Sequence, residues 1–291
     1  MISSTLASSL PALTALTNLM DPVASAAPRA AFTSTEILVA IAQRQWVLHF
    51  QPKVSLASGN LTGMEALVRW NHPQVGLVLP DEFIGVVNAC GAIDALTDWV
   101  LQAAVQQQAR WAEQAFPIPI AVNVSIDNLR SEGFARRAGA LAREAGVAAH
   151  DVTLEVTERG ATSPSPKPLD CLFQLRLRKF KLSIDDFGTA QSSLNQLRDV
   201  PFTELKIDRA IVQDASQDPA RQPLLKQSIG IAKGLCMVSV AEGVETELEW
   251  KMLRAMHCDV AQGFFIGRPM AEDRVPAWIN DWEVRRRQLF S

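Results

Sequence analysis

The 291-residue sequence lacks several features that would assign it to a class of protein at once. Its four cysteines are scattered and form no CxxC pair, which argues against a disulfide framework and against a structural zinc site. So little cysteine favours a reducing compartment, and we expect a cytoplasmic protein. No apolar run approaches the roughly 20 residues that a membrane-spanning helix needs, so we expect no membrane span.

An excess of positive charge is missing as well. The chain has 28 basic and 31 acidic residues, a formal net charge of −3. A mildly acidic protein has no general attraction to nucleic acid, and we expect no nucleic-acid partner. Any ligand that carries phosphate must therefore be bound by a local site.

The first residues differ in composition from the rest of the chain. Residues 1–32 are rich in Ala, Ser, Thr and Pro, with no basic residue before Arg29. The stretch "ASAAPRA" weakly resembles a signal-peptidase site, but positive charge near Met1 and an uninterrupted apolar core are both missing. We expect a flexible leader over residues 1–32 and one domain over residues 33–291.

From about Thr33 onward, short β-rich runs alternate with amphipathic helical runs. The eight candidate strands begin at Trp46, Leu61, Pro119, Val152, Lys181, Thr203, Met237 and Cys258. This alternation predicts an α/β fold, a (β/α)8 barrel of the TIM type. A doubly wound open sheet is the alternative, but no GxGxxG or Walker-type loop supports it.

Each candidate strand carries a polar residue near its carboxyl end. These residues are Gln51, Glu65, Asn123, Glu155, Asp185 with Asp186, Lys206, Glu242 and Gln262. In a barrel the carboxyl ends of the strands converge on one mouth, where active sites of this fold are built. A single glutamate in a strand is commonly half of a structural ion pair, but a polar residue on every strand predicts a site.

The predicted mouth contains five carboxylates, which would repel one another in a site of low dielectric constant. Lys206 and Arg69 cannot neutralise all of them, whereas divalent cations can. An oxygen-rich ligand set with one Asn suits Mg²⁺ or Mn²⁺. Two such ions about 3.5–4 Å apart activate a water molecule for in-line attack at phosphorus, so the residues predict a metal-dependent phosphoester hydrolase.

Asp185 and Asp186 pose a problem, because successive side chains of a strand point to opposite faces. We expect the strand to end there and the chain to turn away, so that both carboxylates lean into the mouth. One of them could then bridge two metal ions.

The order of several motifs is similar to that of the EAL-domain proteins. The motifs are "MEALVRW", "VNVS", "LEVTE", "DDFGT", "LKIDR", "VAEGVET" and "QGFFIGRP". The resemblance covers roughly residues 34 to 275. It implies a phosphodiesterase that opens cyclic di-GMP to linear pGpG with Mg²⁺ or Mn²⁺, and a modified barrel whose first strand runs antiparallel to the others.

The resemblance also implies roles for individual residues. The first metal would be held by Glu65, Asn123, Glu155 and Asp185, and the second by Asp185, Asp186 and Glu242. Lys206 would hydrogen-bond the attacking water or stabilise charge on the phosphate, with Glu242 as the alternative general base. Substrate or water would be contacted by Gln51, Leu67, Arg69, Asp208 and Gln262, and Glu158 and Glu245 would support the loop after Asp186 and the metal ligands.

Two of these assignments have a plain structural alternative. Arg69 could form a strand-end ion pair, and Asp208 could cap a helix. A homodimer is expected by resemblance. No GGDEF-type cyclase motif or sensor segment is found, so we expect a stand-alone EAL domain regulated by oligomerisation, a partner or expression level.

The chain also departs from the family pattern. Ala190 and Gln191 replace a Gly and an aromatic residue, Ile211 replaces an aromatic residue, and Asn88 and Ala89 stand in a commonly acidic stretch. Because no metal ligand is lost, we predict an active phosphodiesterase. The alternative is a catalytically weak module that acts as a cyclic di-GMP receptor and signals to a partner protein.

Overall fold

A computed structural model describes residues 32–158, 166–188, 198 and 200–290. Residues 1–31 of the expected leader, and the departures Ala190 and Gln191, lie outside the described residues. The folded unit includes Phe32, whose ring lies 4.6 Å from that of Trp70 between centroids.

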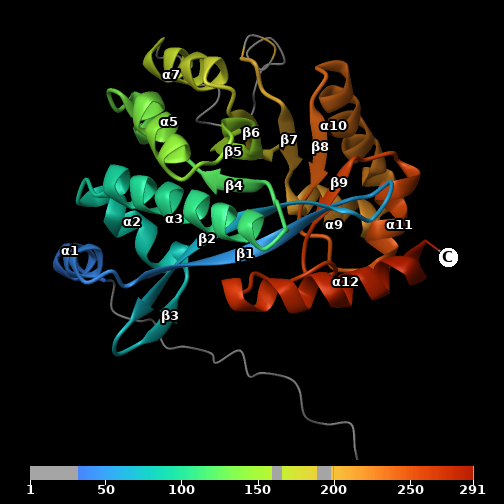
Figure 1. Ribbon diagram of the computed structural model, residues 1–291. Helices are drawn as coiled ribbons and strands as arrows, with labels where there is room; N and C mark the ends of the chain where they lie inside the picture. The colour runs from blue at the N-terminus through green and yellow to red at the C-terminus, as the bar shows by residue number, and fades with distance from the viewer. Residues whose placement is uncertain (1–31, 159–165, 189–197, 199, 291) are drawn as a thin grey trace, which may run out of the picture. The chain divides into compact units, whose positions relative to one another are not determined.

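Among the described residues, eight strands close into a barrel, and a ninth forms a hairpin with one of them (Figure 1). The strands are β1 (Trp46–Ser55), β2 (Leu61–His72), β3 (Gly76–Val78), β4 (Ile120–Asn123), β5 (Val152–Thr157), β6 (Lys181–Phe187), β7 (Glu204–Ile207), β8 (Val238–Ala241) and β9 (Val260–Gln262). The sheet order is β1-β9-β8-β7-β6-β5-β4-β2, and β2 pairs back onto β1. This closure confirms the predicted barrel and excludes the open sheet.

The first strand runs antiparallel to both of its neighbours, β2 and β9, as the resemblance implied. From β2 through β4 to β9 the barrel strands pair in parallel. The short β3 was not predicted. It pairs with the end of β2 as a hairpin, outside the closed barrel.

Helices surround the barrel (Figure 1). They are α1 (Ser34–Ala42), α2 (Pro80–Ala89), α3 (Ile93–Glu113), α4 (Ile126–Arg130), α5 (Phe134–Glu144), α7 (Pro166–Leu177), α9 (Arg209–Gln217), α10 (Gln222–Gly234), α11 (Glu247–Ala255) and α12 (Val275–Leu289). Within the described part of the chain, no helix combines the length and the apolar character needed to cross a membrane.

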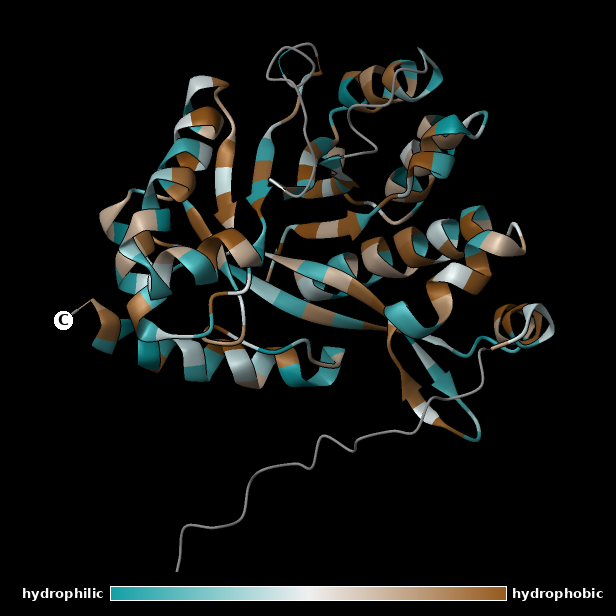
Figure 2. Cartoon of the chain, turned by 180° about the vertical axis from the view of Figure 1, so that it is seen from behind, coloured by the Kyte–Doolittle hydropathy of each residue, from teal (hydrophilic) through white to brown (hydrophobic). Residues whose placement is uncertain are grey.

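The core lies between the strands and these helices. Leu154 and Val156 of β5 and Leu182 and Ile184 of β6 are fully buried, and along each strand they alternate with polar residues. Hydrophilic and hydrophobic residues mix along the surrounding helices in Figure 2. This mixture is expected where one face of a helix packs on a barrel and the other meets solvent.

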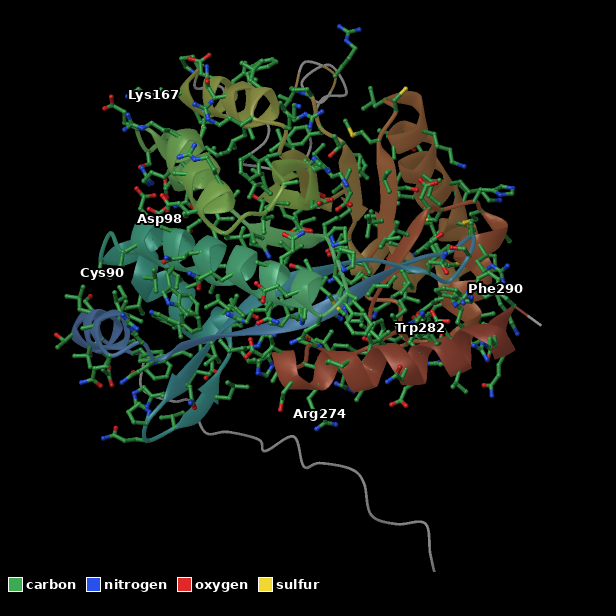
Figure 3. All side chains as sticks on the ribbon, viewed as in Figure 1. Cys90, Asp98, Lys167, Arg274, Trp282 and Phe290 are labelled. Carbon is green, nitrogen blue, oxygen red and sulfur yellow. The ribbon has the colours of Figure 1, made fainter. Side chains whose placement is uncertain are left out.

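Helix α12 is the last helix of the described chain, and its aromatic residue Trp282 contacts α11 and the turn between β1 and β2. Trp282 and Phe290, which are labelled in Figure 3, lie 6.1 Å and 6.4 Å from the ring of Trp250 between centroids. The indole N–H of Trp282 donates to the carbonyl of Gly59 at 2.8 Å. The last helix is thereby fixed to the turn between β1 and β2.

Candidate active site

Asp185 and Asp186 lie at an irregularity of β6. Ile184 faces Leu205 of β7, but the next paired residues are Phe187 and Ile207, so β6 contains one extra residue here. Asp186 has a φ of 57°, in the left-handed region that Asp tolerates better than most residues. Such a bulge re-aims neighbouring side chains, which explains how both carboxylates serve one site. We expected the strand to end at these residues; it continues to Phe187.

Lys206 of β7 lies at the centre of the acidic cluster. Its Nζ is 2.7 Å from Glu242 Oε1, 2.9 Å from Glu155 Oε2, 2.9 Å from Asp185 Oδ1 and 3.6 Å from Glu65 Oε2. Its side chain is only 1% exposed. Four strands or strand ends therefore bring their carboxylates to one ammonium group, including Glu242, which lies just after β8.

The charges of this cluster shift the pKa values of its members in opposite directions. Burial alone would raise the pKa of Glu155, but Lys206 and Lys53 outweigh burial and lower it to about 2. Burial and the Asp185 charge raise the pKa of Glu242 to about 8, although Lys206 opposes this shift. Burial and Glu155 raise the pKa of Glu65, and burial and Asp185 raise that of Asp186. Such opposed shifts are frequent at functional sites.

Glu65 is oriented by two amide side chains. Asn123 Nδ2 donates to its Oε1 at 2.7 Å, and Gln262 Nε2 donates to its Oε2 at 2.5 Å. Gln262 Nε2 also lies 3.2 Å from Gln51 Oε1, and Gln51 donates to the carbonyl of Gly267. The glutamate of the "EAL" triplet is thus held in place by residues of β1, β4 and β9.

The residues present suit a divalent cation. One ligand atom each from Asp185, Asp186 and Glu242 can be chosen so that all three lie within 4.8 Å of one another, and all three side chains are half-buried. Oxygen ligands of this kind are those that Mg²⁺ and Mn²⁺ prefer.

A cavity of about 400 Å³ lies beside the cluster. Leu67, Asn123 and Glu155 line it together with apolar residues of α2 and α3. Arg69 is 8% exposed, and its Nη1 donates to the carbonyl of Val68 at 2.8 Å. Burial lowers the pKa of Arg69, while the charges of Glu65 and Asp81 oppose that shift.

The remaining predicted residues lie around the mouth in different roles. Asp208 is the N-cap of α9 and accepts from the N–H of Ala210 at 2.8 Å. Glu158 is buried and accepts from the N–H of Gly188 at 3.0 Å, which ties the end of β5 to the residue after β6. Glu245 is exposed, and its backbone N–H donates to Glu249.

The departure at Ile211 falls beside the bulge. A Cβ on Gly188 would lie 2.3 Å from Ile211 Cδ1, so the two residues touch. Gly188 has a φ of 102°, a backbone conformation that residues with a Cβ rarely adopt. The residue that replaces the usual aromatic thus packs against the chain directly after the paired aspartates.

Two charged residues of the barrel interior were not predicted. Lys53 Nζ lies 2.5 Å from Glu155 Oε1 and 3.0 Å from Glu204 Oε1. The available signal was the spacing in "FQPKVS", which puts Lys53 on the same face as Gln51. The expectation that polar site residues occupy strand ends led us to overlook it.

Comparison with known proteins places the chain in a family. The EAL domain family model matches residues 34–269. A cyclic di-GMP phosphodiesterase of Pseudomonas aeruginosa, PA2567, is 34% identical over 259 residues, which are 89% of this chain and 44% of that protein. The cyclic di-GMP phosphodiesterase RocR of the same species is 34% identical over 77% of this chain and 57% of its own length.

The fold is also found among solved structures. The PaMucR phosphodiesterase in its c-di-GMP complex matches with a TM-score of 0.79 and 35% identity, over 83% of this chain and 98% of that one. The chain spans about half the length of the two curated relatives. The family match covers the barrel and every element that supplies the acidic cluster, and the chain belongs to the EAL domain family.

Proposed function

We propose that this protein is a metal-dependent phosphodiesterase that hydrolyses cyclic di-GMP to linear pGpG. One observation carries the proposal: carboxylates of Glu65, Glu155, Asp185 and Glu242 surround Lys206 at the barrel mouth. Asp186 adds a fifth carboxylate through the bulge of β6. An acidic site of this kind needs cations to accept an anionic phosphodiester.

Two ions, Mg²⁺ or Mn²⁺, are the cofactors that we propose. The first would be held by Glu65, Asn123, Glu155 and Asp185, and the second by Asp185, Asp186 and Glu242. When bound, such ions lower the pKa of a water molecule and offset the charge of the phosphodiester.

The reaction adds one water molecule across one of the two phosphodiester bonds. The water oxygen bonds to phosphorus, the bond from phosphorus to one ribose 3′ oxygen breaks, and that oxygen takes up a proton. Lys206 has its Nζ among the carboxylates that would surround this water, and we assign to it a hydrogen bond to the water or to the phosphate. Glu242 remains the alternative general base. Gln51, Leu67, Arg69, Asp208 and Gln262 are the residues to which we assign substrate or water contacts.

Turnover of cyclic di-GMP by the purified chain tests the proposal. The assay compares Mg²⁺, Mn²⁺ and excess chelator, resolves pGpG by anion-exchange chromatography, and includes Glu65→Ala. Glu144→Ala, an exposed position on α5, is the matched control. We expect pGpG that requires metal, disappears in Glu65→Ala and persists in Glu144→Ala. Binding of intact cyclic di-GMP without turnover in either metal would contradict the enzyme and identify a receptor.

We further propose a homodimer and a cytoplasmic location. Light scattering coupled to gel filtration tests the first, and a monomer at every protein concentration would refute it. All four cysteines carry free thiols, which a reducing compartment maintains. Cell fractionation tests the second, and recovery outside the cytoplasm would refute it.

A further inference from the structure

A chain of alternating charges runs from the mouth of the barrel toward its other end. Glu242, Lys206, Glu155, Lys53 and Glu204 follow one another, each within 3.0 Å of the next. Ser183 Oγ closes the series by donating to Glu204 at 2.9 Å. TIM barrels commonly fill this space with branched apolar side chains, so a polar series needs an explanation.

Of the two lysines in the series, Lys53 lies farther from the mouth. Because β1 runs antiparallel to its neighbours, Lys53 lies two residues deeper than Gln51 on the same face. It is 4% exposed. Burial disfavours its charge, but Glu155 and Glu204 outweigh burial and raise the pKa of Lys53 well above its usual range.

Stability alone does not explain a buried lysine here. Replacing a buried ion pair by apolar residues of similar volume is often neutral or stabilising. The geometry offers a different reason: Lys53 binds Oε1 of Glu155, and Lys206 binds Oε2 of the same carboxylate. The two lysines therefore fix both oxygens of one proposed metal ligand.

A cation that binds at the mouth would affect the contact of Lys206 with Glu155 but not that of Lys53. A cation bound by Glu155 Oε2 has to share or replace the contact of Lys206, whereas the contact of Lys53 lies on the other oxygen. Resting on the function proposed above, we propose that Lys53 is a positioning residue that holds Glu155 so that Oε2 faces the metal site. Partners behind metal ligands commonly change metal affinity by about 10- to 100-fold when they are removed.

Mn²⁺ binding to the metal-free protein measures this role without substrate. Free Mn²⁺ is counted by electron paramagnetic resonance during titration of the wild type, of Lys53→Met, and of Lys181→Met. Lys181 lines the same cavity of about 270 Å³ at the base of the barrel but is exposed, so it is the matched control. We expect about 10- to 100-fold weaker binding at the tighter site in Lys53→Met, and a change of less than about twofold in Lys181→Met.

The double variant Lys53→Met with Glu204→Gln separates positioning from charge compensation. If Lys53 only neutralises Glu204, removing both charges restores wild-type Mn²⁺ affinity, and that result overturns the proposal. If Lys53 positions Glu155, the double variant stays at least about tenfold weaker than Glu204→Gln alone. Far-ultraviolet circular dichroism shows whether Lys53→Met is folded. If it is not, the double variant takes its place in the titration.

Kinetics gives a second readout. We expect the kcat of Lys53→Met to be low at limiting Mn²⁺ and to recover as Mn²⁺ is raised, with the KM for cyclic di-GMP unchanged. If Lys53→Met binds Mn²⁺ as tightly as the wild type while the wild type turns over cyclic di-GMP, the role proposed for Lys53 is refuted but the proposed function stands. A wild type that neither binds Mn²⁺ nor forms pGpG refutes the proposed function itself.

Discussion

Replacing Lys206 by Met is the most informative perturbation of the acidic cluster. The change removes the ammonium group that lies within 3.6 Å of four carboxylates, at a side chain only 1% exposed. Removal of one partner from a buried ion pair costs about 3–5 kcal/mol, because it leaves charge buried without compensation. In chelator, Lys206→Met should therefore lose about that much free energy of unfolding.

Divalent metal should reverse much of this loss. A ligand that binds only the folded state at 100 times its Kd stabilises by about 2.7 kcal/mol. In the wild type Lys206 occupies the same oxygens, so part of the binding free energy is lost in displacing it. We expect saturating Mn²⁺ to stabilise Lys206→Met more than it stabilises the wild type, although phosphodiesterase activity falls by about 10²-fold or more.

Urea unfolding in chelator and in Mn²⁺ measures both quantities. Lys226→Met, at an exposed position on α10, is the control and should behave as the wild type. Equal stability of Lys206→Met and the wild type in chelator, together with equal stabilisation by Mn²⁺, would refute the reasoning. It would mean that the carboxylates are already neutral or hydrated.

Three further predictions follow from the site and its frame. Because the pKa of Glu242 is raised to about 8 in the folded protein, the metal-free protein binds more protons than the unfolded chain, and its stability should fall as pH rises. Between pH 6 and pH 8 the loss is at most about 3 kcal/mol, and thermal unfolding in chelator should show it in the wild type but only weakly in Glu242→Gln. Gly243 has a φ of 64°, and a Cβ at this position would lie 2.4 Å from Arg209 Cβ. Gly243→Ala should therefore displace the adjacent Glu242, lower the free energy of unfolding in urea by about 1–3 kcal/mol and lower kcat. An unchanged free energy of unfolding together with an unchanged kcat would contradict this prediction. Trp282 is buried, so Trp282→Ala should lower the free energy of unfolding by about 3–5 kcal/mol in the same assay. At temperatures where the variant is folded, its kcat should equal that of the wild type. A lower kcat in a variant that is as stable as the wild type would show instead that α12 acts on the site.

The barrel could be predicted because its evidence is local. In β5 and β6, buried Leu, Val and Ile residues alternate with polar ones, and this period of two identifies the strands without any tertiary information. The closed barrel follows from eight such strands with helices between them. The hairpin strand β3 has three residues and no such alternation, which is why periodicity did not reveal it.

The acidic cluster could be predicted for a related reason. Glu65, Asn123 and Glu155 lie on parallel strands whose carboxyl ends meet, so strand position alone brings them together. The means by which Asp186 joins them could not be predicted, since a bulge depends on the pairing of β6 with β7 and no residue type announces it. Nor does sequence spacing tell an exposed Glu245 from a buried Glu158.

Lys53 escaped prediction because we expected site residues only at strand ends, although the resemblance already implied the antiparallel first strand that carries it. On a parallel strand, residues beyond the mouth residue leave the barrel, and a lysine two positions after Gln51 would reach solvent. On the antiparallel β1 the same step leads downward, so Lys53 enters the interior and meets Glu155 from beneath. A reversed first strand thereby lets the barrel support a mouth carboxylate from the side opposite to the proposed metal. If the first strand were parallel and still placed Gln51 at the mouth, the position below the mouth would precede Gln51 in the sequence. It would be the position that His49 now occupies.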